Sequence, residues 1–214
     1  MTRKTAAILV LLSVASLTLA GPERLWVGKF SETGLLDWEE HEFKGRSQYR
    51  LVDLGDTRVI RADSAAAASG LFRSITVNLN ETPFLNWRWW VENTLTGTDE
   101  QTKGGDDYPA RVYVVKKGFL PWNTKAVNYV WSSNQPVGTA WPNAYTGNAR
   151  MLALQSGTEH SGQWQSERRN VKADFQTLFG EAVDEITTIA LMTDTDNSGK
   201  QATAYYGDIY FSAE

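Results

Sequence analysis

Two acidic segments of this 214-residue chain carry residue types that bind cations or hydroxyl groups. In the first, Gly104-Gly-Asp-Asp-Tyr-Pro-Ala-Arg111, two aspartates follow a pair of glycines, and Arg111 lies close behind them. Asp106 and Asp107 could bind a cation, accept hydrogen bonds from sugar hydroxyls, or act as acid and base. They could equally cap the backbone amides of a solvated turn. Catalysis is the weakest of these readings, because adjacent aspartates rarely face each other across a substrate.

The second acidic segment, Asp194-Thr-Asp-Asn-Ser-Gly199, matches the opening of a calcium loop. Oxygen ligands at alternate positions and a glycine at the sharp turn are typical of such loops. Tyr205 stands where the closing bidentate acid of an EF-hand would be, so an EF-hand is not expected. Asp194 and Asp196 are therefore candidates for a simpler structural Ca²⁺ site. The alternative is a tight hairpin stabilised by Asx turns.

Aromatic residues are dense, with nine tryptophans in the chain. Most are expected to pack in the core, which is the usual place of tryptophan in a sandwich. Trp122 and Trp141 lie instead in segments rich in Pro, Gly and Asn, and Tyr145 follows shortly after. Loop aromatics are harder to explain by packing, so these three are predicted to contact a ligand.

The segment Ser166-Glu-Arg-Arg-Asn-Val171 adds a charged candidate. On a strand, Glu167 and Arg169 share one face, while Arg168 shares the other with Asn170. The guanidinium of Arg168 suits carboxylates and sugar hydroxyls. An ion-pair ladder within the sheet is the alternative.

Familiar enzyme signatures are missing. The chain has no Gly-x-Ser-x-Gly elbow, phosphate loop, dinucleotide fingerprint or His-Glu-x-x-His motif. It has no cysteine, which excludes a thiolate nucleophile and cysteine-based metal sites, and only two histidines. The net charge of −4 comes from scattered residues and does not favour nucleic acid, whose binding needs a basic stripe.

The N-terminus indicates export. A basic start at Arg3 and Lys4 precedes an apolar run and the sequence Thr18-Leu-Ala20. The run is too short to span a bilayer, so residues 1–20 are predicted to be a cleaved signal peptide. Residues 21–214 are then one domain without a transmembrane segment, periplasmic or extracellular, and large enough to bury a core without disulfides.

The elements that must position these residues are mostly strands. Short β-like runs, several of them alternating apolar and polar residues, are separated by Gly, Pro, Asn and Asp. The predicted strands are 25–30, 49–54, 58–62, 70–78, 85–91, 110–115, 126–132, 150–155, 164–170, 187–193 and 204–211. Residues 171–183 have helical spacing, with Gly180 as a stop. This pattern predicts an all-β sandwich, a jelly roll with one short helix.

Several blocks of the chain resemble an uncharacterised bacterial family, domain-of-unknown-function family 3047. They are Leu85-Asn-Trp-Arg-Trp, Asp106-Asp-Tyr-Pro-Ala-Arg-Val-Tyr-Val-Val115, Tyr129-Val-Trp-Ser132, Asn148-Ala-Arg-Met151, Glu167-Arg-Arg-Asn-Val171, Asp194-Thr-Asp-Asn and Tyr205-Tyr-Gly-Asp-Ile209. The resemblance implies kinship across nearly all of the mature chain and implies no activity. The last strand is also similar to that of galactose-binding-like jelly rolls, the architecture of many carbohydrate-binding modules.

Together these features predict an exported, non-catalytic module that binds an envelope glycan or exopolysaccharide. The expected ligand-binding residues are Asp106, Asp107, Arg111, Trp122, Trp141, Tyr145 and Arg168. One alternative is a polysaccharide hydrolase or lyase that uses Asp106 or Asp107 with Arg111 or Glu167. Another is a periplasmic domain whose aromatic loops dock an envelope protein.

Overall fold

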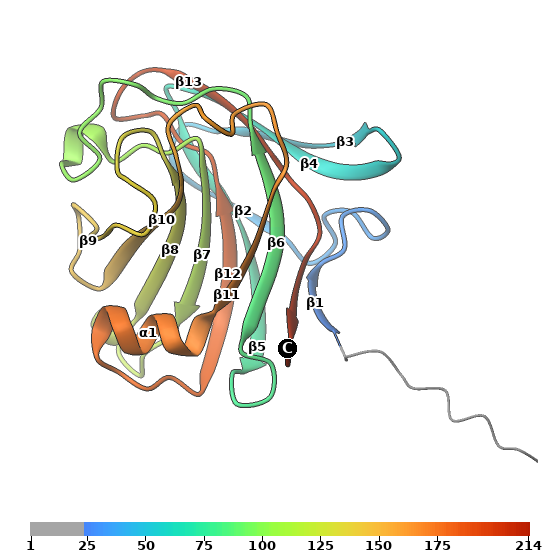
Figure 1. The fold of residues 1–214 in the computed structure, drawn as a ribbon, viewed down its shortest axis with the longest axis vertical. Helices are drawn as coiled ribbons and strands as arrows, with labels where there is room; N and C mark the ends of the chain where they lie inside the picture. The colour runs from blue at the N-terminus through green and yellow to red at the C-terminus, as the bar shows by residue number, and fades with distance from the viewer. Residues whose placement is uncertain (1–23) are drawn as a thin grey trace, which may run out of the picture.

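A computed structural model of the chain describes residues 24–214, so the predicted signal peptide lies outside the described residues. Within residues 24–214, the strands form two seven-stranded sheets that face each other (Figure 1). Sheet A contains β1 (Arg24–Gly28), β14 (Ile209–Ser212), β6 (Phe84–Val91), β13 (Gln201–Tyr206), β4 (Thr57–Ala65) and β3 (Gln48–Leu54), with β11 (Gln165–Asn170) paired to β6. Sheet B runs in the order β2 (Glu39–Lys44), β5 (Ala68–Asn78), β12 (Glu185–Met192), β7 (Ala110–Lys116), β8 (Lys125–Ser132), β10 (Ala149–Ser156) and β9 (Ala140–Pro142). The predicted all-β sandwich is confirmed.

The core lies between the sheets and follows from the alternation of each strand. Trp87 and Trp89 of β6 point inward and are buried, whereas Arg88 and Trp90 point outward, as the pleat predicts. The Trp87 and Trp89 rings meet edge to face, with centroids 5.5 Å apart and ring planes at 88°. In sheet B, alternate residues of β7 also point inward, so Arg111 is placed on the outer face of that sheet.

The helix α1 (Val171–Phe179) is well capped, which explains its short length. The side chain of Asn170 accepts a hydrogen bond from the Ala173 amide at 3.0 Å, satisfying one of the free donors of the first turn. Gly180 adopts a left-handed conformation with φ of 67° and ends the helix. The helix predicted within residues 171–183 is confirmed with its stop at Gly180, and residues 181–183 are not helical.

The C-terminal segment differs from its prediction. β12 belongs to sheet B and β13 to sheet A, so the acidic turn between them crosses from one sheet to the other and does not close a hairpin. The predicted strand 204–211 is divided in two at Gly207 and Asp208. The Asp208 carboxylate accepts hydrogen bonds from the Ser31 amide at 2.9 Å and the Ser31 hydroxyl at 2.5 Å, which anchors this break.

Two strands of sheet B lack a sequence signal. β2 is an exposed edge strand in which Phe43 is the only apolar residue, so no alternation of apolar and polar positions reveals it. β9 has only three residues and pairs with β10 at Trp141↔Met151. Sequence patterning identifies strands through burial of one face, and neither of these two strands gives a long enough pattern.

Candidate functional site

A cavity of about 480 Å³ lies on the outer face of sheet B, where loops fold back over the strands. Its lining brings together Phe43, Lys44, Ala68, Asp106, Arg111, Tyr113, Asn128, Asn143, Tyr145, Thr146, Ala149, Met192, Asp194, Asp196 and Asn197. Five of the nine residues predicted from sequence as ligand or metal sites are in this set. The cavity is therefore the candidate site.

The floor of the cavity is made by outward-pointing residues of three adjacent strands. Arg111 and Tyr113 come from β7, Asn128 from β8 and Met192 from β12. The pairing register sets Met192 opposite Arg111 and Asn128 opposite Tyr113, so these side chains form two neighbouring rows. Strand alternation therefore fixes this polar floor on a sheet whose other face is the apolar core.

Arg111 ties the loops around the cavity to the sheet. Its Nε donates to Asp194 Oδ1 at 2.7 Å, and its Nη2 donates both to the other Asp194 oxygen and to the Asp106 carbonyl at 2.8 Å. The guanidinium also lies 4.4 Å from the centroid of the Tyr108 ring. Burial alone would lower the pKa of Arg111, but the neighbouring Tyr113 and Asp106 raise it above its usual range. Arg111 thus stays charged and acts as the bridge between two loops.

Two buried oxygens of the cavity residues have no hydrogen-bond partner within the described part of the chain. Asp106 uses Oδ2 to accept from Asn143 Nδ2 at 2.9 Å, while its Oδ1 is unpartnered. Asn128 is 1 % exposed, and its Oδ1 is also unpartnered. Leaving such an atom without a partner costs about 1–3 kcal/mol. Asp106 Oδ1 and Asn128 Oδ1 could therefore accept hydrogen bonds from a ligand that carries hydroxyl or amine groups.

Aromatic rings form part of the rim. Tyr145 and Phe43 are exposed and come from opposite sides of the cavity, one from the loop after β9 and one from β2. The Tyr145 hydroxyl donates to Asn197 Oδ1 at 2.8 Å, and the Lys103 carbonyl lies 3.2 Å away as a second acceptor for the same proton. Tyr145, which the sequence predicts to contact a ligand, therefore lies at the rim of the cavity and is held there by contacts with two loops.

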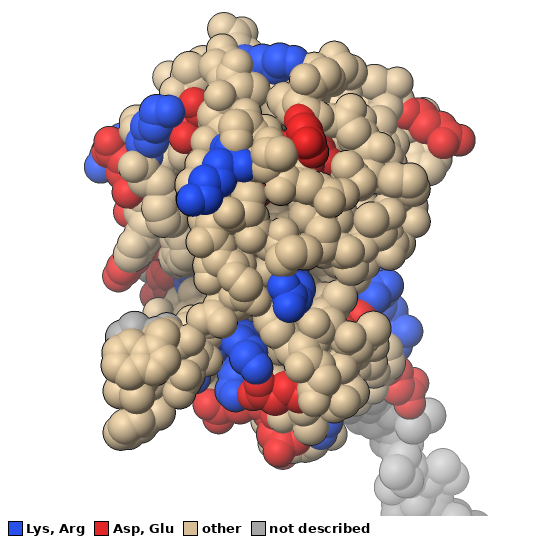
Figure 2. Space-filling model, turned by 90° about the vertical axis from the view of Figure 1, so that its left-hand side faces the viewer, with Lys and Arg blue, Asp and Glu red and all other residues tan. Residues whose placement is uncertain are grey.

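The surface on the β9 side of the molecule has no single-sign charge patch. Figure 2, which views this side, shows charged side chains of both signs scattered among uncharged ones. A phosphate backbone needs a continuous basic surface, so this face does not suit nucleic acid. Among the described residues, no helix has the length and apolar character that a membrane span requires.

The family profile of DUF3047, described as a protein of unknown function, matches residues 36–210. The chain belongs to the DUF3047 family. The matched range includes every residue that lines the cavity, and the family resemblance seen in the sequence is confirmed. No curated protein matches this DUF3047 chain significantly.

Solved structures similar to this DUF3047 protein include carbohydrate-binding modules and a xyloglucanase domain. One is TmCBM61 in complex with β-1,4-galactotriose, at 11 % identity and a TM-score of 0.42, with 87 % of this chain and 94 % of that chain covered. A second is the family 30 carbohydrate-binding module of a Clostridium thermocellum cellulase, at 9 % identity and a TM-score of 0.44. The match covers 83 % of this chain and 92 % of that chain. A third is the xyloglucanase domain of NopAA from Sinorhizobium fredii in complex with cellobiose, at 11 % identity and a TM-score of 0.46. The match covers 83 % of this chain and 93 % of that chain. Identities of 9–11 % transfer no ligand or activity to this chain.

Asp107 does not line the cavity, in contrast to the prediction. It is fully buried and caps the acidic crossover loop. Its Oδ1 accepts from the Asn197 amide at 3.1 Å, and its Oδ2 accepts from the Ser198 amide at 2.6 Å. The turn chemistry considered as an alternative therefore describes Asp107, while Asp106 keeps a position on the cavity.

The prediction that Trp141 offers its ring to a ligand is wrong, because the ring is buried. It is only 4 % exposed and packs in a small second core on the outer face of sheet B, with its ring 6.4 Å from that of Tyr108. Its loop-like composition is misleading because the short strand β9 pairs with β10 and turns the ring inward. Trp122 is 67 % exposed at the 3₁₀ turn η2 (Pro121–Asn123), but it does not line the cavity.

Arg168 and Glu167 lie in sheet A and are separate from this cavity. Glu167 points inward, where its Oε1 accepts from Trp89 Nε1 at 3.1 Å and from Gln155 Nε2 at 2.7 Å. Burial raises the pKa of the Glu167 carboxyl above its usual value. Arg168 points to the opposite face, as the predicted strand alternation requires. The acid–base pairing of Glu167 with Asp106 or Asp107 is therefore not assembled.

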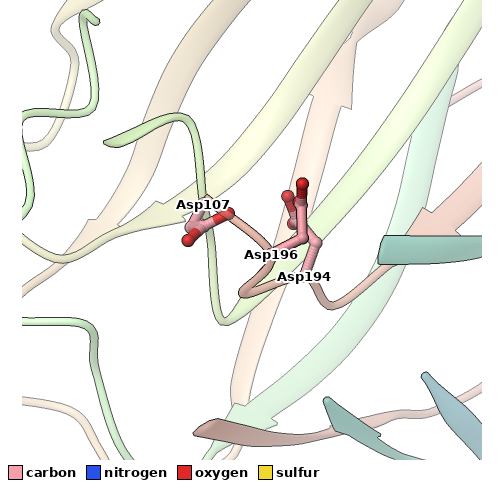
Figure 3. Close-up of side chains that lie close together, drawn as sticks. All are labelled: Asp107, Asp194 and Asp196. Atoms are coloured by element: carbon pink, nitrogen blue, oxygen red, sulfur yellow. The ribbon is translucent and has the colours of Figure 1, made fainter. Parts of the chain in front are cut away.

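Asp194 and Asp196, the predicted calcium ligands, lie near Asp107, with one oxygen of each within 4.8 Å of the others. Figure 3 shows Asp194 and Asp196 side by side on the crossover loop, with Asp107 on a neighbouring segment. Their oxygens already have donors: Arg111 bridges Asp194, backbone amides hold Asp107, and Lys44 Nζ lies 3.5 Å from Asp196. Ca²⁺ takes six to eight oxygen ligands, so it would have to displace these contacts.

We therefore expect excess Ca²⁺ and EDTA to give the same thermal unfolding midpoint. Binding of an ion to the folded state alone would raise stability by about 2.7 kcal/mol at a hundredfold excess over Kd. Differential scanning fluorimetry with Ca²⁺, with Mg²⁺ and with EDTA would measure this. An increase of several degrees with Ca²⁺ alone would restore the calcium hypothesis.

Sequence reasoning did not identify Tyr113, Asn128, Asn143 or Phe43 as site residues. A signal for the first two was present, because Tyr113 and Asn128 alternate with core residues along β7 and β8 and therefore share the outer face with Arg111. Asn143 and Phe43 reach the cavity through tertiary folding of a loop and an edge strand, for which local patterns give no signal.

Proposed function

We propose that this DUF3047 protein is a non-catalytic module that binds a neutral glycan in the cavity on sheet B. The observation that carries the proposal is the pairing of unpartnered acceptors at Asp106 and Asn128 with the aromatic rings of Tyr113 and Tyr145 in one cavity. Sugar hydroxyls supply donors, and the apolar face of a sugar ring packs on aromatic rings.

The acidic residues around the cavity support binding over hydrolysis. The carboxylates of Asp194 and Asp107 are committed to Arg111 and to loop amides, and the remaining acid of the cavity, Asp196, accepts from Asn197 Nδ2 at 3.2 Å and lies 3.5 Å from Lys44 Nζ. Hydrolysis of a glycosidic bond generally needs two carboxylates about 5–10 Å apart across the scissile bond. The hydrolase alternative therefore lacks a free pair of carboxylates.

Export belongs to the same proposal and is supported by the sequence of residues 1–20, with its basic start, apolar run and small residues. A periplasmic or extracellular location would give the module access to envelope glycans and exopolysaccharides.

Titration calorimetry against a panel of neutral oligosaccharides and soluble peptidoglycan fragments tests the function. Tyr113→Ala is expected to weaken binding about tenfold, or ~1.4 kcal/mol, because the ring is part of the floor. Asn128→Leu should also weaken binding without lowering the unfolding midpoint, because the replaced oxygen has no partner to lose.

Trp122→Ala is the matched control, because this exposed aromatic residue lies outside the cavity. It should leave glycan affinity unchanged. If Trp122→Ala abolishes glycan binding while Tyr113→Ala does not, the glycan binds at the loop that carries Trp122 and not in the cavity. Failure of every neutral glycan to bind would remove the proposed function.

A further inference from the structure

A second pocket, of about 390 Å³, lies on sheet A and is rich in arginine. It is lined by Arg24, Trp26, Asn86, Trp87, Arg88, Ser166, Glu167, Arg168, Asp208 and Tyr210. Residues from four strands contribute, namely β1, β14, β6 and β11. None of the residues lining the cavity on sheet B takes part, so the two pockets are independent.

The pairing register explains how these residues meet. Trp26 lies opposite Tyr210, Tyr210 opposite Asn86, and Asn86 opposite Arg168. Residues in register across a sheet point to the same side, so these four form one row on the outer face. Arg88 lies two residues further along β6 and extends the row toward Ser166, its partner on β11.

Arg24, Arg88 and Arg168 have no carboxylate within 4.0 Å among the described residues. Seven of the other described arginines are paired with a carboxylate, for example Arg61 with Asp63 at 2.9 Å on the same sheet, and Arg150, on sheet B, is the exception. The three guanidinium groups lie instead over aromatic rings. Arg24 is 4.5 Å from the Tyr210 centroid, Arg88 is 4.6 Å from Trp164, and Arg168 is 3.7 Å from Phe84. Aromatic rings orient a cation without neutralising it, so its charge is left for a ligand.

Gly207 makes room for one of these arginines. A Cβ at this position would lie 2.6 Å from Arg88 Cγ and 2.7 Å from Arg88 Nε. The backbone at Gly207 is bound to Arg88 through its amide, which donates to the Arg88 carbonyl at 2.9 Å. The side chain of Arg88 therefore passes directly over a glycine on one side and against Trp164 on the other, which fixes its position in the pocket.

The two acids of the pocket do not neutralise the arginines. Asp208 accepts both of its hydrogen bonds from Ser31, and Glu167 points inward to Trp89 and Gln155. Three positive charges thus face two carboxylates that are bound elsewhere. The pocket is short of an anion that would lie among the guanidinium groups.

We propose that this pocket on sheet A binds the carboxylate groups of an acidic polysaccharide, built of uronic acid units. Guanidinium groups match carboxylates with two parallel hydrogen bonds, and Asn86 and Ser166 add polar groups for neighbouring hydroxyls. The net charge of −4 opposes long-range attraction of any polyanion, so binding at this pocket would depend on the local guanidinium contacts and weaken with salt. This site is additional to the glycan cavity on sheet B.

Affinity electrophoresis in gels containing polygalacturonate tests the proposal. The protein should be retarded, and the same polymer with its carboxylates methyl-esterified should retard it at least tenfold less. The double variant Arg24→Gln/Arg168→Gln changes two exposed side chains and should weaken retardation at least tenfold at an unchanged unfolding midpoint. Arg88→Gln should weaken it as well.

The matched control is Arg46→Gln/Arg58→Gln, which removes the same charge from exposed arginines that are paired with Glu42 and Asp53. Compared with its own mobility in a gel without polymer, it should be retarded as strongly as the unmodified protein. Equal losses in both double variants, or equal retardation by DNA and dextran sulfate, would overturn the proposal in favour of a general charge effect. Tyr113→Ala should bind polygalacturonate normally, so failure of the neutral-glycan cavity and failure of this site are told apart.

Discussion

Replacing Arg111 with methionine is expected to lower the free energy of unfolding by about 3–5 kcal/mol, a large share of the stability of a typical domain. The guanidinium is 5 % exposed and bridges Asp194, which is 1 % exposed. Removing it leaves a buried carboxylate without its cation, which costs far more than an exposed ion pair contributes. The substitution also removes the hydrogen bond from Arg111 to the Asp106 carbonyl, which is the second contact that joins the two loops. Urea unfolding followed by tryptophan fluorescence would measure the change.

Arg58→Met provides the comparison, because Arg58 is paired with Asp53 at the surface, where both side chains are at least half exposed. Its loss should be within about 1 kcal/mol. Adding Asp194→Leu to Arg111→Met removes the unpaired charge and should recover part of the lost stability. If Arg111→Met is no more harmful than Arg58→Met, the bridge does not hold the loops and the account of this site is wrong.

Strand patterns in the sequence predict the sandwich because one face of each central strand is buried. The strand β6 shows such a pattern. Trp87 and Trp89 face the core, while Arg88 and Trp90 point outward, and the structure follows this alternation. The exposed edge strand β2 is missed because nothing on it is buried. The crossover from β12 to β13 is mistaken for a hairpin because turn residues report the local bend and carry no information on which sheet receives the next strand.

The site is predictable to the extent that chemistry is concentrated in sequence. Asp106, Arg111, Asp194 and Asp196 stand in two acidic segments and do meet at the cavity. Trp141 is misjudged, because composition suggests a loop while a three-residue strand buries the ring. Phe43 and Asn143 come to the cavity from distant parts of the chain, and no local pattern signals that approach.

Gly105→Ala is expected to disrupt both the acidic turn and glycan binding. The turn η1 (Lys103–Gly105) packs against the backbone of Asp99, and a Cβ on Gly105 would overlap the Asp99 carbonyl group. Because the overlapping atoms are backbone, relief requires the turn to move, at a cost of about 1–3 kcal/mol or more. Asp106 and Asp107 follow directly, so the shift would separate Asp107 from the Ser198 amide and Asp106 from Asn143. Affinity for a neutral glycan should fall at least tenfold.

Gly104→Ala is the matched control, since a Cβ on this neighbouring glycine would meet nothing within 4 Å. It should fold normally, and its stability should be unchanged or raised by up to about 1 kcal/mol, because alanine restricts the unfolded chain. Binding to polygalacturonate should survive in both variants, because the pocket on sheet A does not involve the turn. Equal behaviour of the two alanine variants in unfolding and in neutral-glycan titration would show that close packing at Gly105 does not position the acidic pair. Gly104 and Gly105 lie in the same turn, but only Gly105 is packed against Asp99. A different response of the two alanine variants would therefore show that this contact, and not the flexibility of the turn, sets the geometry of the cavity.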